Sequence, residues 1–143
     1  MHIHQISVFL ENRTGQLAEV TKLLSDNHIN LRAISIAESA DYGLLRIIVD
    51  DTQKAADILL KAGNIITMNP VVVVAVPDQP AGLSQVLGLL SEGKIGIEYM
   101  YALFTHQQGK AYMVFRTEDE GAFIALLRSH GLDAVTPAEL DLK

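Results

Sequence analysis

Apolar and polar residues change their period several times along the first half of the chain, and each change marks a new element. Ile6, Val8 and Leu10 recur at every second position, which is typical of a strand. From Leu17 onward the apolar residues return at helical spacing, and Asn27 is expected in a left-handed conformation at that helix end. In order, this half predicts a strand over residues 6–10, a turn at 12–15, a helix over 17–24, strands over 29–37 and 44–49, a helix from 51 or 52 to 62, and a strand over 65–68.

The second half of the chain repeats the first. When residues 17–25 are aligned with residues 83–91, the leucine, valine and serine positions coincide. The repeat predicts two domains, residues 1–69 and 70–143. The elements expected in the second domain are a strand over 71–76, a turn at 78–82, a helix over 83–90, a hairpin of 95–104 and 111–115, and a helix that a capping box at 117–120 opens and that ends at Gly131.

Each half has the order strand, helix, strand, strand, helix, strand. That order predicts an α+β fold of two ferredoxin-like βαββαβ units in tandem, with helices on one face of each antiparallel sheet. A sheet face that meets water is polar, but here Val71 and Val73 lie among further valines, and Tyr99, Tyr101 and Tyr112 add aromatic surface. Apolar sheet surface needs cover, so we expect the two sheets to pair side by side and the chain to form a homodimer.

The composition restricts the compartment and the partners that we expect for the protein. The chain has 143 residues, with 17 acidic and 11 basic side chains, a net charge of −6 and no cysteine. Without cysteine there is no disulfide, no thiolate nucleophile and no cysteine-based zinc site, which suits a reducing cytoplasm. The negative charge argues against nucleic acid and against an anionic membrane surface as partners. No export signal or membrane-spanning stretch is visible, so we expect a cytoplasmic protein.

No catalytic or metal-binding pattern emerges from the sequence. His2 and His4 share one face of an extended segment but stand at the amino end, and no histidine has metal-ligand spacing. The serines lack the strand–turn–helix elbow of a nucleophile, and no phosphate loop or dinucleotide fingerprint is present. The acidic clusters at 50–51 and 118–120 fall where helix starts favour negative charge. We therefore expect no enzyme activity, no metal and no cofactor.

Two turns, at residues 12–17 and 78–83, stand at matching places after the first strand of each unit. Each offers a polar side chain, Asn12 or Asp78, followed by a helix start. The unpaired N–H groups of a helix N-terminus stabilise a carboxylate, and the side-chain oxygen can accept from an ammonium group. Such a turn can hold both ends of an α-amino acid. Capping of the helix alone also accounts for these residues, so both interpretations stay open.

The two turns, the amphipathic helices after them and the strand entries at residues 29–31 and 95–97 resemble the ACT domain. The resemblance covers nearly the whole chain, twice over, as in the small stand-alone tandem ACT proteins of bacteria. It implies a non-catalytic regulatory module that binds a free amino acid at the interface between its two ACT domains. Such a module modulates a partner enzyme or pathway.

Carried over by position, the resemblance implies two candidate ligand sites. The first joins the turn residues Leu10, Glu11, Asn12, Thr14, Gly15, Gln16 and Leu17 to the strand residues Tyr99, Met100 and Tyr101 of the other domain. The second joins Asp78, Gln79, Pro80, Ala81, Gly82 and Leu83 to Ser35 and Ala37. The first site is preferred because Gly15 permits the closest backbone approach. Tyr99 and Tyr101 also suit a sheet or dimer interface.

The turns depart from the family pattern in two places. Thr14 stands where proline is usual, and Ala81 stands where glycine is usual, with Gly82 one place later. Two alternatives to an amino-acid-binding regulatory module also follow from the sequence. Residues 6–12 look like the start of the small subunit of acetolactate synthase, which suggests a regulatory subunit of a biosynthetic enzyme. The other alternative is a dimerisation module without a ligand.

Overall fold

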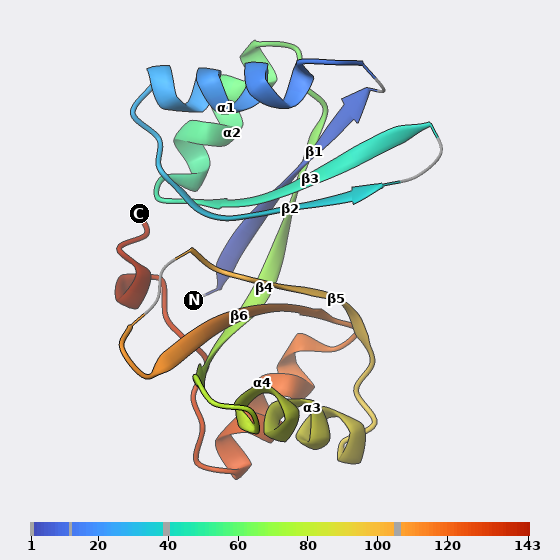
Figure 1. Cartoon of the computed structure of the whole chain (residues 1–143), viewed down its shortest axis with the longest axis vertical. Coiled ribbons are helices and arrows are strands. Elements are labelled where there is room, and N and C mark those ends of the chain that lie inside the picture. Colours follow the sequence, from blue (N-terminus) through green and yellow to red (C-terminus); the bar gives the residue numbers. More distant parts are fainter. Residues whose placement is uncertain (1, 12, 39–40, 105–106) are drawn as a thin grey trace. The chain divides into compact units, whose positions relative to one another are not determined.

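The computed structural model of the chain describes residues 2–11, 13–38, 41–104 and 107–143 (Figure 1). The chain forms two compact units. The N-terminal unit comprises His4–Asn69 together with Asp141–Lys143. The C-terminal unit comprises Pro70–Leu140 together with Met1–Ile3.

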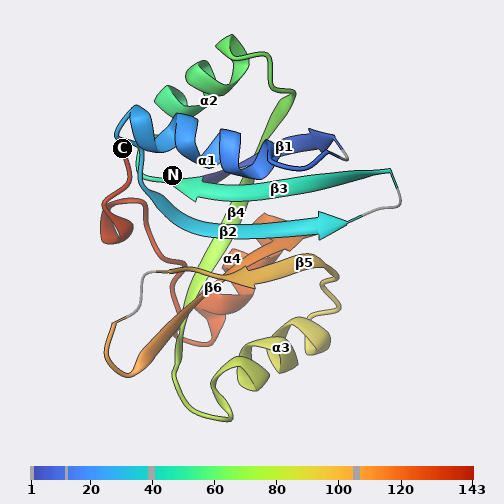
Figure 2. The same cartoon turned by 45° about the horizontal axis from the view of Figure 1, so that its top comes forward.

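The N-terminal unit is an antiparallel sheet with two helices on one face (Figures 1 and 2). Its strands follow the order β2-β3-β1-β4, with Val8 of β1 opposite Leu45 of β3. This is the strand order of a ferredoxin-like unit. The elements are β1 (Ile3–Glu11), α1 (Gln16–Asp26), β2 (Leu31–Glu38), β3 (Tyr42–Val49), α2 (Thr52–Lys61) and the first part of β4 (Ile66–Pro77).

The core of this unit lies between the sheet and the two helices. Alternate residues of β1 and β3 face the helices, as the period of two requires, and the apolar stripes of α1 and α2 cover them. Each large aliphatic side chain buried in this way contributes about 1.5–3 kcal/mol. The buried members of the cluster are Ile6, Val8, Leu10, Val20, Leu24, Ile29, Leu45, Ile47, Val49, Ala55, Ala56 and Leu59.

Strand β4 is one continuous strand, Ile66–Pro77, where the pattern predicts two separate strands. The polar Asn69 and the following Pro70 interrupt the apolar run, which is why the sequence indicates a break there. The backbone nevertheless stays extended through both residues, and the Arg116 guanidinium donates to the Pro70 carbonyl at 3.0 Å. Strand β4 pairs with β1 in the N-terminal unit and with β6 in the C-terminal unit.

The C-terminal unit repeats the same elements up to its last strand. They are α3 (Gly82–Glu92), β5 (Ile97–Ala102), β6 (Lys110–Thr117), α4 (Glu120–Ser129) and a short 3-10 helix, Ala138–Leu140. Its core includes Phe115 and Phe123 in an edge-to-face contact at 5.4 Å. The repeat predicts a last strand after Gly131, but residues 132–136 are irregular, although the Val135 N–H donates to the Val73 carbonyl at 2.8 Å. The predicted α+β fold of tandem ferredoxin-like units is confirmed.

Each of the helices α1–α4 ends in the same backbone motif, in which a residue with positive φ follows the C-cap. The predicted stops at Gly63 and Gly131 have φ of 90° and 73°. For α1 the prediction is wrong by one position: Asn27 has φ −102°, and His28 takes the left-handed conformation at φ 59°. Lys94 does the same after α3, at φ 56°.

The helix starts of α2 and α4 are capped by aspartate. Asp51 accepts from the Lys54 N–H, as one of the two predicted caps for α2. At α4 the cap is Asp119 and not Thr117, the first residue of the predicted capping box. Thr117 is instead the last residue of β6 and is buried, so the helix begins two positions later than the box indicates.

Candidate functional site

The turn between β1 and α1 presents an uncapped helix start. Gly15 has φ 93°, a left-handed conformation that L side chains rarely adopt, and a Cβ placed on it would meet no atom within 4 Å. No described side chain caps α1, and its first intrahelical backbone bond runs from the Glu19 N–H to the Gly15 carbonyl. The first amides of the helix therefore keep the partial positive charge that attracts an anion.

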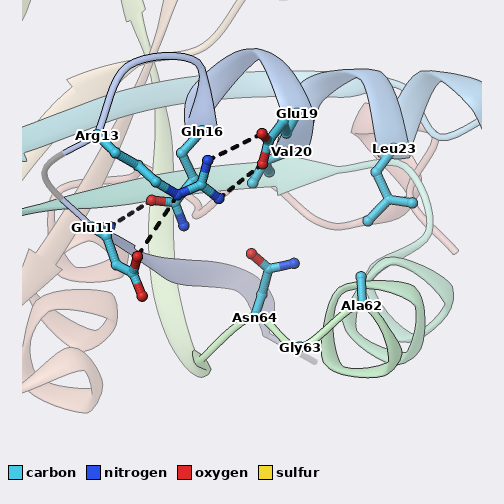
Figure 3. A pocket seen from close by; sticks show the side chains of 9 residues that line it. All are labelled: Glu11, Arg13, Gln16, Glu19, Val20, Leu23, Ala62, Gly63 and Asn64. Atoms are coloured by element: carbon cyan, nitrogen blue, oxygen red, sulfur yellow. Dashed lines mark hydrogen bonds and ion pairs between the residues drawn. The ribbon is translucent and has the colours of Figure 1, made fainter.

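Gln16 is a buried polar side chain directly behind this turn, with a relative exposure of 9%. Its Oε1 accepts from the Glu11 N–H at 2.6 Å. This bond satisfies a backbone donor at the end of β1 and fixes which way the amide group lies, because the opposite orientation would place N–H against N–H. Figure 3 shows the remaining Nε2 directed into a pocket beside the turn.

Arg13 carries the ion pairs of the turn. Its guanidinium donates two hydrogen bonds to the Glu19 carboxylate, at 3.1 and 2.9 Å, and its Nε lies 3.7 Å from Glu11 Oε2. The hydrogen bond to Glu19 raises the pKa of Arg13, and the same guanidinium lowers the pKa of the Glu19 carboxyl. These groups are exposed, so their pairing orients the side chains more than it stabilises the fold.

A pocket of about 300 Å³ lies between α1 and the segment that follows α2 (Figure 3). Its volume is at the lower end of the range for small-molecule sites. Polar groups come from the turn and from Asn64, and an apolar wall comes from α1 and Ala62. The lining residues are Glu11, Arg13, Gln16, Glu19, Val20, Leu23, Ala62, Gly63 and Asn64.

The structure gives the residues of the first predicted site different roles. Glu11 and Gln16 line the pocket. Leu10 is buried in the core of the N-terminal unit and Leu17 packs against that core, so both position the turn from behind. Thr14 and Gly15 are exposed at the turn itself, and Asn12 lies outside the described residues.

The strand residues of the first predicted site are on β5. Tyr99 and Tyr101 stack at a centroid distance of 6.4 Å and are half-buried. Met100, between them, packs against the core of the C-terminal unit. Alternation along the strand thus places the two tyrosines on the sheet face opposite the helices.

The second predicted site has a tighter turn. A Cβ on Gly82 would lie 1.9 Å from the Pro77 carbonyl oxygen, so the start of α3 rests directly on the end of β4. The turn is closed by backbone bonds from Asp78 N–H to Gly109 O and from Gly82 N–H to Gln79 O. In the aligned repeat, Gln16 and Glu11 correspond to Gly82 and Pro77, so both the amide and the N–H that it binds are absent from this turn.

The other residues of the second predicted site are dispersed around this turn and on β2. Leu83 packs against the C-terminal core. Ser35 and Ala37 are half-buried, and they lie opposite Arg46 and Leu44 of β3. The remaining residues are exposed at the turn: Asp78, Gln79, Pro80 and Ala81.

Seven of the pocket residues are missing from the sequence-based site. Glu19, Val20 and Leu23 follow Gln16 on one face of a helix, so the predicted helix contains a signal for them. Ala62, Gly63 and Asn64 come from the end of α2, and no local pattern connects them to the first turn. Arg13 is in the predicted turn, but its role depends on where Glu19 lies.

The described residues contain no group of three or more histidine, cysteine, aspartate or glutamate side chains that could hold a metal ion. Within the same part of the chain, no helix has the length and apolar character to cross a membrane.

A family model for the ACT domain pair matches residues 1–140, and the chain belongs to this family. A protein of Bacteroides thetaiotaomicron with a crystal structure is 38% identical, with a TM-score of 0.91, and the match covers 99% of this chain and 96% of that chain. No curated protein sequence matches the chain.

Regulatory subunits of aspartate kinase share the fold at low identity. The ligand-free subunit from Thermus thermophilus has a TM-score of 0.64 at 15% identity, covering 88% of this chain and 91% of that chain. The subunit from Thermus flavus has a TM-score of 0.58 at 16% identity, and the match covers 91% of this chain and 94% of that chain. The chain is thus an ACT domain pair whose structural neighbours include regulatory subunits.

Proposed function

We propose that this ACT domain pair is a non-catalytic sensor that binds a free amino acid at the β1–α1 turn and modulates a partner enzyme. The observation that carries the proposal is the uncapped start of α1 behind the left-handed Gly15. The helix amides would receive the α-carboxylate, and the exposed carboxylate of Glu11 would receive the ammonium group.

The first turn is the preferred site because its backbone is accessible. At Gly15 there is open space around the Cβ position, whereas at Gly82 the strand end fills it. A ligand that must approach helix amides closely has room only where the backbone is open. The proposal therefore assigns one sensing turn to the chain.

The proposal also includes a cytoplasmic homodimer. The absence of cysteine supports a reducing compartment. Strand β2 is an edge strand with an exposed apolar residue, Ile36, at 46% relative exposure, and an apolar edge favours pairing with a second copy.

The test is a thermal-shift panel with all the common amino acids on the whole chain. At about a hundred times the dissociation constant, a true ligand adds about 2.7 kcal/mol to the free energy of unfolding. Gly15→Leu is expected to abolish this shift because the side chain would fill the open space in front of the helix amides.

Gly131→Leu is the matched control for that variant. Gly131 has φ 73° and the same open surroundings, so the two variants carry the same backbone strain, about 1–2 kcal/mol. Both variants should lose similar stability, but only Gly15→Leu should lose the ligand. A folded protein that responds to no amino acid would contradict the proposal and favour a dimerisation module. Co-purification with a catalytic subunit would instead favour a regulatory subunit of a biosynthetic enzyme.

A further inference from the structure

The pocket beside the turn presents one hydrogen-bond donor and one acceptor whose positions are fixed by the backbone. Gln16 uses its Oε1 to accept from the Glu11 N–H, which leaves Nε2 for the pocket. Asn64 uses its Nδ2 to donate to the Leu59 carbonyl at 3.1 Å, which leaves Oδ1 for the pocket. Turning either amide over would set like groups against each other.

Gln16 Nε2 has no acceptor among the described residues, and it is accessible from the pocket although the residue as a whole is only 9% exposed. Figure 3 shows Gln16 on α1 and Asn64 on the segment after α2, on opposite walls of the pocket, with this nitrogen and the Asn64 oxygen both drawn below the Arg13 side chain. A ligand that supplies an acceptor can take up this donor, with a net gain of about 0.5–1.5 kcal/mol over its hydrogen bond to water. On the opposite wall, Asn64 Oδ1 can accept from a donor of the same ligand.

We infer that this pocket recognises the side-chain carboxamide of the bound amino acid, so that the ligand is asparagine or glutamine. A carboxamide supplies a carbonyl oxygen for Gln16 Nε2 and an N–H for Asn64 Oδ1 at once. This inference rests on the proposed function, because the turn that would hold the amino acid backbone shares Glu11, Arg13 and Gln16 with the pocket.

The charge around the pocket disfavours an anionic side chain, and the Gln16 donor disfavours a cationic one. Glu11 and Glu19 face a single guanidinium, that of Arg13, so the rim has one net negative charge. A ligand carboxylate would meet that charge and the Asn64 oxygen, which are both unfavourable. A cationic side chain would be attracted by that charge, but it has no acceptor for the N–H groups of Gln16.

The second unit lacks both amide groups. Helices α2 and α4 end alike, at Gly63 and Gly131, and the next residue is Asn64 in one case and Leu132 in the other. Gly82 stands where the first unit has Gln16. At the corresponding positions the second unit therefore carries neither amide group.

The test is isothermal titration calorimetry on the whole chain with L-asparagine and L-glutamine, each compared with L-aspartate or L-glutamate. At least one amide is expected to bind about tenfold or more tightly than the acid of the same shape, because the acid lacks the donor for Asn64 and meets the negative rim. Equal or tighter binding of the acids overturns the inference, and so does the absence of binding by both amides.

Two variants locate the preference in the pocket. Gln16→Met keeps the length of the side chain and adds no charge to the rim, while the donor is lost. Asn64→Leu introduces the residue that the second unit has. Each variant is expected to reduce the preference for the amide by about tenfold, and Leu132→Asn, the matched control, should leave it unchanged. An amide preference that survives in both variants overturns the inference.

Failure of the inference is distinguishable from failure of the proposed function. If an amino acid without a carboxamide binds tightly and Gly15→Leu abolishes that binding, the sensing turn stands and the assignment of the pocket is wrong. If the amide preference is present but insensitive to Gln16 and Asn64, the ligand lies at the turn and not in this pocket. If Gly15→Leu loses binding but the Gln16 and Asn64 variants do not, the result supports the sensing turn and not the carboxamide pocket.

Discussion

Gly15 and Gly82 occupy the starts of α1 and α3, and each is required for a different physical reason. At Gly15 the backbone has φ 93° but the surroundings are open. At Gly82 the close contact is decisive, because a Cβ would lie 1.9 Å from the Pro77 carbonyl oxygen. The turn at Gly15 needs glycine for its backbone conformation and leaves space for a ligand. At Gly82 the strand end already occupies the corresponding space.

Gly82→Ala is expected to lower the free energy of unfolding by about 3 kcal/mol, because the new methyl group clashes with backbone that cannot move aside cheaply. Chemical denaturation measures the effect. Gly88→Ala is the control in the same helix, since a Cβ there meets nothing within 4 Å. That control should raise stability by about 0.5–1 kcal/mol, as alanine favours a helix interior more than glycine. Equal effects of the two substitutions would contradict the close contact.

The sequence predicts the turn but not the pocket beside it. Gln16 follows from the turn pattern, yet its amide becomes informative only once Glu11 and α1 fix its orientation. Asn64 reaches the site because α2 ends beside α1, and that is a tertiary fact with no local signal. The repeat does offer one clue: both residues differ from their counterparts, Gly82 and Leu132. Such a difference shows that the two positions are not equivalent, but it does not predict which residues they contact.

At the scale of elements, the ends of α1 and α3 carry strain that the other helices avoid. His28 and Lys94 adopt φ of 59° and 56° at the position where α2 and α4 have glycine. A left-handed conformation is unfavourable for a residue with a Cβ. The strain persists because the backbone bonds that follow, such as Ile95 N–H to Leu90 O at 3.0 Å, close the helix.

Lys94→Gly is therefore expected to raise the free energy of unfolding by about 0.5–1 kcal/mol, the strain relieved exceeding the entropy that glycine adds to the unfolded chain. The melting temperature of the whole protein reports the change. Gln85→Gly, in the interior of the same helix, serves as the opposite control and should cost about 1 kcal/mol. A loss of stability in Lys94→Gly would mean that the lysine side chain contributes more than its backbone costs.

Most elements follow from the hydrophobic period, and the exceptions have identifiable causes. The apolar alternation of β1 and the stripe of α1 are sufficient to predict both, since tertiary burial matches the local pattern. Strand β4 passes through Asn69 and Pro70, residues that usually end a strand, and the Arg116 guanidinium donates to the Pro70 carbonyl at this point. The sequence pattern predicts Thr117 as a helix cap, but Thr117 is buried at the end of β6. Burial in the sheet therefore outweighs its tendency to cap the helix.

At the scale of the molecule, each compact unit includes residues from the opposite end of the chain. Asp141–Lys143 belong with His4–Asn69, and Met1–Ile3 belong with Pro70–Leu140. The sequence repeat shows none of this, because it compares equivalent positions and not contacts. The domains at residues 1–69 and 70–143 thus remain a prediction from the repeat, while each compact unit also includes a short piece from beyond that boundary.

The last residues of the chain are expected to stabilise the N-terminal unit through the backbone. The Lys143 N–H donates to the Asp50 carbonyl at 2.8 Å, and the Asp50 N–H in turn donates to the Asn30 carbonyl at 3.0 Å. A variant that ends at Leu140 should lose about 1 kcal/mol, the usual net contribution of one hydrogen bond. Hydrogen exchange at the Asp50 and Asn30 amides should accelerate accordingly. Lys143→Ala, which keeps the amide, should leave exchange unchanged, so equal effects of the two variants would assign the stabilisation to the side chain.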